Sequence, residues 1–109
     1  MQGNRGKNII IELTFLFSLK IIKYVELLEE KKKFIIARQL LKSATSIGAN
    51  VREAQNAESK ADFIHKLKIS AKEADETIYW LELCKYSKGY PNDDELLEDC
   101  NNIVRVLSK

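Results

Sequence analysis

One stretch of the chain combines the residue types of a phosphate-binding loop. It is SATSIGANVREA, residues 43–54, in which three hydroxyl side chains precede Gly48. A Walker-type loop places glycines around the turn and ends in Lys-Ser or Lys-Thr. Gly48 is the only glycine between Gly6 and Gly89, so the stretch lacks that pattern. We therefore interpret it as part of a helix rather than as a nucleotide site.

The other side chains capable of catalysis are isolated. His65 is the single histidine, so any Ser-His-acid or Cys-His site would depend on it. Helical spacing places His65 outside the apolar face of its helix. Glu73 and Glu76 share a helix face, but Lys66 and Lys72 lie close enough to make that face an ordinary charged surface. We predict no enzymatic activity, no catalytic residue, and no cofactor or metal.

The cysteines and the apolar N-terminal segment indicate where the protein resides. Cys84 and Cys100 lack metal-ligand spacing, and we predict reduced core thiols rather than a disulfide. Charged residues interrupt the apolar segment, and its longest charge-free run after Glu12 is Leu13–Leu19. A membrane-spanning helix needs about 20 apolar residues. No small-residue cleavage site follows the segment, so we expect a cytoplasmic protein that does not enter a membrane.

The apolar residues recur at helical spacing in four segments, which predicts an all-α protein. The first helix ends near EEKKK, residues 29–33, and the second extends from about Lys33 to Ala57. The third is capped by Ser59 and reaches about Ser87, while KGYPND separates it from a short fourth helix that Asn92 could cap. Four amphipathic helices with short connections predict an antiparallel up-and-down four-helix bundle. We expect residues 1–7 to be flexible and residues 8–109 to form one domain. The predicted inward face of the third helix consists of Ile64, Leu67, Ala71, Ala74, Ile78 and Leu81.

Gly48 lies on the predicted core stripe of the second helix. A glycine in a helix interior costs about 1 kcal/mol relative to alanine, so its presence suggests a backbone close to a neighbouring helix. Ala44, one turn earlier, would complete a groove of small residues. Beside this groove runs a polar stripe that is either solvated or hydrogen-bonded across a helix interface. Its members are Ser43, Ser46, Asn50 and Glu53.

The charges are unevenly distributed along the chain, although the net charge is only +2. Residues 1–52 hold ten Lys or Arg against four acidic residues, a net +6, whereas residues 53–109 hold eight against twelve, a net −4. This asymmetry reflects either solvated helix faces or a head-to-tail contact between copies. The basic residues before and along the second helix are candidates for sequence-independent phosphate binding, or form an ordinary surface. They are Lys31, Lys32, Lys33, Arg38, Lys42 and Arg52.

Two helices carry more apolar residues than one buried stripe requires. Residues of this kind that lie off the inward faces indicate a second covered surface, which we interpret as an oligomer interface. The candidates are Leu13, Leu16 and Leu27 in the first helix and Ile69, Trp80 and Leu83 in the third.

The segment QLLKSATSIGANVREAQNAESKADFIHKLKISAKEADETIYWLELC, residues 39–84, resembles the signature region of the bacterial four-helix bundle proteins. This family includes the proteins encoded in intervening sequences of 23S rRNA, and basic pentameric accessory proteins of diversity-generating retroelements. The resemblance implies an up-and-down bundle, a ring-shaped homopentamer, and RNA or a nucleic-acid-processing protein as partner. The alternative is a homo-oligomeric scaffold that contacts only proteins. The positions matching the family's central motif are Ser43, Ser46, Gly48, Asn50 and Glu53.

Overall fold

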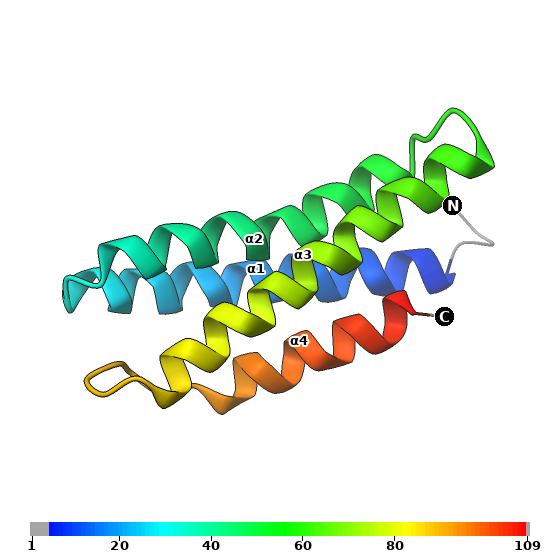
Figure 1. The fold of residues 1–109 in the computed structure, drawn as a ribbon. Helices are drawn as coiled ribbons and strands as arrows, with labels where there is room; N and C mark the ends of the chain where they lie inside the picture. Colours follow the sequence, from blue (N-terminus) through cyan, green and yellow to red (C-terminus); the bar gives the residue numbers. More distant parts are fainter. Residues whose placement is uncertain (1–4, 109) are drawn as a thin grey trace.

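A computed structural model describes residues 5–108, which form an antiparallel up-and-down four-helix bundle (Figure 1). The helices are α1 (Arg5–Glu30), α2 (Phe34–Ala54), α3 (Lys60–Tyr86) and α4 (Asp94–Leu107). Each helix packs against the next along the chain, and α1 also packs against α4, so the bundle closes on itself. It measures 45 × 20 × 19 Å. The predicted all-α fold is confirmed.

Local signals set most helix boundaries. The Ser59 side chain accepts a hydrogen bond from the Asp62 backbone N–H at 3.0 Å, which confirms the predicted cap of α3. Asp93, rather than Asn92, caps α4 by accepting from the Leu96 N–H at 3.2 Å. At the other end of the chain, α1 already begins at Arg5, inside the segment that we expected to be flexible. Residues 1–4 of that segment lie outside the described residues.

The end of α1 is formed without glycine or proline. Lys32 adopts a left-handed backbone conformation with φ of 63°. Its N–H donates to the Glu29 carbonyl, and the Lys33 N–H donates to the Leu28 carbonyl, both at 2.9 Å. This pair of hydrogen bonds is a Schellman motif, which is usually completed by glycine at the left-handed position. The turn therefore carries a conformational cost at Lys32.

We expect Lys32→Gly to raise the free energy of unfolding by about 0.5–1 kcal/mol. The left-handed conformation costs a non-glycine residue about 1–2 kcal/mol, and part of the gain is offset by the greater freedom of glycine in the unfolded chain. Chemical denaturation monitored by circular dichroism would measure the change. Lys31→Gly is the matched control, because Lys31 does not have a positive φ and this substitution should destabilise the protein. A Lys32→Gly variant less stable than wild type would contradict the prediction.

The core is mainly apolar, and its buried polar residues are Thr14 of α1, Ser43 of α2, and Ser70 and Thr77 of α3. Its largest fully buried side chains come from α1, α2 and α4. The predicted inward face of α3 is confirmed in part: Ala74 and Leu81 are buried, Leu67 and Ile78 pack against the core, and Ile64 is exposed. The residues that α3 actually buries are Ser70, Ala74, Thr77, Leu81 and Cys84.

Hydrogen bonds explain why small polar residues of α3 face inward. The Ser70 hydroxyl donates to the Ile47 carbonyl of α2 at 2.8 Å, and the hydroxyls of Ser43 and Thr77 are 2.9 Å apart. Buried hydroxyl groups that find such partners cost little. The small side chains also allow α2 and α3 to pack closely. Apolar periodicity therefore identified part of the inward face of α3 and missed its buried hydroxyl residues, Ser70 and Thr77.

Both cysteines are buried free thiols, as predicted. Burial raises the pKa of Cys100 to about 12 and also raises that of Cys84. Raised pKa values keep both groups in the neutral, weakly nucleophilic form.

None of the helices in the described part of the chain combines the length and apolarity that a membrane crossing requires.

Candidate self-association and nucleic-acid surfaces

Helix α1 exposes a row of large apolar side chains. Their exposed fractions lie between 36 and 49%, although they occur in the middle of a regular helix. Leu13, Leu16 and Leu27 were predicted to lie off the core stripe, and all three are exposed. We define the α1 apolar face as Ile9, Leu13, Leu16, Leu19 and Leu27.

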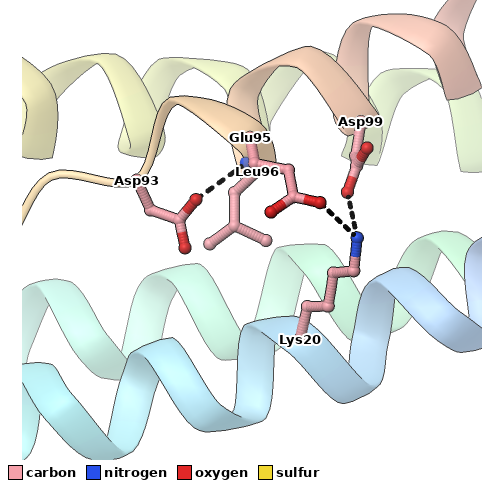
Figure 2. Close-up of polar contacts among 5 residues, drawn as sticks. All are labelled: Lys20, Asp93, Glu95, Leu96 and Asp99. Atoms are coloured by element: carbon pink, nitrogen blue, oxygen red, sulfur yellow. Dashed lines mark hydrogen bonds and ion pairs between the residues drawn. The ribbon is translucent and has the colours of Figure 1, made fainter.

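Part of the α1 apolar face borders a groove between α1 and α4. The groove has a volume of about 300 Å³, and Phe17 and Ile103 form part of its lining. At its rim Lys20 donates to Glu95 at 3.1 Å and to Asp99 at 2.9 Å, and Figure 2 shows this fork between α1 and α4. The hydrogen bonds to Asp99 and Glu95 raise the pKa of Lys20. Because Lys20 and Glu95 are solvent-exposed and Asp99 is only partly buried, these ion pairs contribute little to stability.

The candidates on α3 are less accessible. Trp80 is half-buried and packs against the core, and its Nε1 donates to Glu76 at 3.2 Å. Ile69 is also half-buried, whereas Leu83 is exposed. Tyr79, whose ring lies edge-on to that of Trp80, is 56% exposed and was not among the residues predicted from the sequence. The α1 apolar face is therefore the stronger candidate for an interface.

The predicted basic residues lie along one side of the bundle but do not form one patch. Lys31 and Lys32 are exposed in the α1–α2 turn, Lys33 is half-buried there, and Arg38 and Lys42 are exposed on α2. Arg52 lies about 28 Å along the helix from this turn at 1.5 Å per residue. Its guanidinium lies 5.3 Å from the ring centroid of Phe15.

Helix α2 contains one acidic residue, Glu53, and that residue is already paired. Its carboxylate accepts from Lys66 of α3 at 2.9 Å. The remaining charged residues of α2 are the basic residues Arg38, Lys42 and Arg52. The exposed side of this helix therefore presents an excess of positive charge.

The central motif contributes to packing between helices. A Cβ atom at Gly48 would lie 3.2 Å from Thr14 Oγ1 and 3.3 Å from Thr14 Cβ, so the predicted close approach is confirmed, with α1 as the neighbour. Ser43 and Glu53 bond across to α3, whereas Ser46 and Asn50 donate to carbonyls of their own helix. Hydrogen bonding across a helix interface therefore holds for Ser43 and Glu53 and not for Ser46 and Asn50, which are half-buried.

The side chains that could act in catalysis or bind a metal are not grouped into a site in the described part of the chain. His65 is exposed on α3. Within residues 5–108, no three His, Cys, Asp or Glu side chains are grouped so that they could hold a metal ion.

Comparison with known proteins places this geometry in a family. The model of the 23S rRNA-intervening sequence protein family matches residues 6–109. The chain is also similar to a solved structure, a protein of unknown function from the S23 ribosomal protein family of Bacteroides thetaiotaomicron VPI-5482. Sequence identity is 40%, the TM-score is 0.88, and the similarity covers 94% of this chain and 95% of that one. No curated protein matches the chain. The resemblance seen in residues 39–84 is confirmed, and the chain belongs to the 23S rRNA-intervening sequence protein family.

Proposed function

We propose that the protein is a non-catalytic bundle that assembles into a closed homo-oligomeric ring and binds RNA. The observation that carries the assembly is the α1 apolar face, whose side chains remain 36 to 49% exposed within the bundle. Scattered apolar residues are normal on a protein surface, but several large ones along one rigid helix mark an interaction site. A second copy of the chain covers this row.

The distribution of charge favours contact between unlike surfaces. The excess of positive charge lies in the α1–α2 turn and on α2, and the excess of negative charge lies on α4, whereas α1 and α3 each carry equal numbers of basic and acidic residues. Within the chain, Lys20 of α1 already pairs with Glu95 and Asp99 of α4. A heterologous contact between copies closes into a ring when its rotation permits. The family resemblance suggests five subunits.

A second observation supports RNA as the partner. The family is described by its link to 23S rRNA. This chain exposes basic residues along α2, and the one acidic residue of that helix, Glu53, is paired with Lys66. Lysine and arginine side chains on a helix neutralise phosphates without reading bases. Binding of this kind is tolerant of sequence and weakens steeply as salt rises. The competing function is a scaffold that contacts only proteins.

Size-exclusion chromatography with light scattering tests both parts. The protein alone at micromolar concentration is expected to show a multiple of the 12.6 kDa monomer mass. Addition of structured or single-stranded RNA should increase that mass at low salt and have less effect at physiological salt. A 12.6 kDa mass would refute the ring, and a two-fold dimer would refute the heterologous contact. An oligomer that gains no mass with RNA at low salt would favour the protein-only scaffold.

A further inference from the structure

One end of the bundle brings the α1–α2 turn next to the α3–α4 loop (Figure 1). The Lys33 ammonium lies 4.7 Å from the centroid of the Tyr90 ring, so the two connections are in direct contact. Between them is a hollow of about 270 Å³. We call it the tip recess, and it is lined by Lys32, Lys33, Phe34, Ile35, Ile36 and Tyr90.

The tip recess combines exposed rings with lysines. Phe34, which lines the recess, is 53% exposed, and Tyr86, which lies outside the lining at the end of α3, is 78% exposed. The Lys85 ammonium lies 5.5 Å from the centroid of the Tyr86 ring. Lys31 and Lys32 are exposed beside the recess. Aromatic rings are therefore presented within reach of ammonium groups, a combination that the sequence alone did not reveal.

Two of the carboxylates near this end are already engaged. Asp93 accepts from the Leu96 N–H as the cap of α4, and the Asp94 carboxylate lies 3.5 Å from the Lys85 ammonium. Glu29 and Glu30 lie in the last turn of α1 and reduce the positive potential there. A polyanion therefore gains moderate electrostatic attraction at the tip, and further affinity must come from the rings.

We propose that the tip recess binds unpaired bases of single-stranded RNA. Aromatic side chains stack on bases of any type, while neighbouring lysines neutralise the phosphates. Bases within a duplex are stacked on one another and are not available to such rings. This proposal rests on the RNA binding proposed above and adds to it a preference for single strands.

The shape and position of the recess agree with this occupant. A flat base can enter a hollow whose lining includes the rings of Phe34 and Tyr90. Insertion into a lipid surface instead requires apolar groups on a projecting surface. Ile9, Leu13 and Leu16 of the α1 apolar face lie in the first half of α1, and the recess lies beyond the other end of that helix. Assembly through that part of α1 therefore leaves the tip accessible to RNA.

Fluorescence titration at low salt tests the preference. The probes are a short labelled single-stranded RNA and the duplex that it forms with its complement. Phe34→Ser should weaken binding of the single strand about tenfold, since one stacked base contributes about 1–3 kcal/mol, and should leave duplex binding unchanged. Tyr86→Ser should act in the same direction. Tyr79→Ser is the matched control, because Tyr79 is an exposed tyrosine of α3 about two turns before Tyr86 and does not line the recess, and this variant should bind both probes like wild type.

The outcomes separate this proposal from the function on which it rests. If wild-type protein binds neither probe, both proposals fail. If it binds both and Phe34→Ser weakens them equally or not at all, only the tip recess proposal fails. Vesicles of phosphatidylcholine and phosphatidylserine provide a further arm: vesicle binding that Phe34→Ser abolishes, with RNA binding unaffected, would assign the tip to a membrane surface and overturn the proposal. Wild-type circular dichroism and melting temperature in each variant confirm that the fold is retained.

Discussion

Leu16→Glu is expected to dissociate the proposed assembly into 12.6 kDa monomers while leaving the helical content unchanged. Leu16 is exposed in the isolated bundle, so a carboxylate at this position remains solvated in the monomer. In the assembly the same carboxylate would be buried against an apolar surface without a partner. Burying an unpaired charge costs several kcal/mol, which would weaken each contact at least about a hundredfold.

The matched control for this experiment is Ile64→Glu. Ile64 is 43% exposed and comparable in character to Leu16, but it lies on α3, away from the α1 apolar face. We expect this variant to retain the wild-type mass in light scattering. A Leu16→Glu variant that keeps the wild-type oligomeric mass would exclude the α1 apolar face as the contact surface. Loss of the oligomer in both variants would indicate that added negative charge, rather than the position, dissociates it.

Gly48→Leu is expected to lower the free energy of unfolding by about 2–3 kcal/mol, with a fall in melting temperature on the order of 10 °C. The added Cβ would approach Thr14, which is buried and whose hydroxyl donates to the Ile10 carbonyl at 2.8 Å. Thr14 is β-branched and has little freedom to rotate away. Helices α1 and α2 must therefore separate to admit the new side chain.

Two substitutions serve as references for Gly48→Leu. Gly48→Ala places the same Cβ near Thr14, but its gain in helix propensity of about 1 kcal/mol offsets much of the cost. Ala49→Leu adds a larger side chain at the neighbouring exposed position and should have little effect on thermal or chemical unfolding. If Gly48→Leu unfolds at the wild-type midpoint, the close approach to Thr14 contributes nothing to stability.

The helices and their order follow from the sequence because the signals for them are local. Periodic apolar residues define each segment, Ser59 caps α3 through its own first turn, and the region around Pro91 interrupts the helical pattern. The exposure of Leu13 and Leu16 also follows, since helical spacing places them off the stripe of α1. Gly48 indicated a close contact, although its neighbour Thr14 could not be named.

The orientation of α3 and the composition of the tip recess were decided by tertiary structure. Ser70 and Thr77 face inward because α2 supplies a carbonyl and a hydroxyl at hydrogen-bonding distance, and apolar periodicity contains no information about such partners. Lys33 and Tyr90 meet because two connections distant in sequence lie at the same end of the bundle. The amino-acid sequence by itself determined which segments are helical and which residues are basic. Only the packing of those helices determined which polar groups are buried and which rings lie beside the lysines, because both depend on contacts between residues that are far apart in the chain.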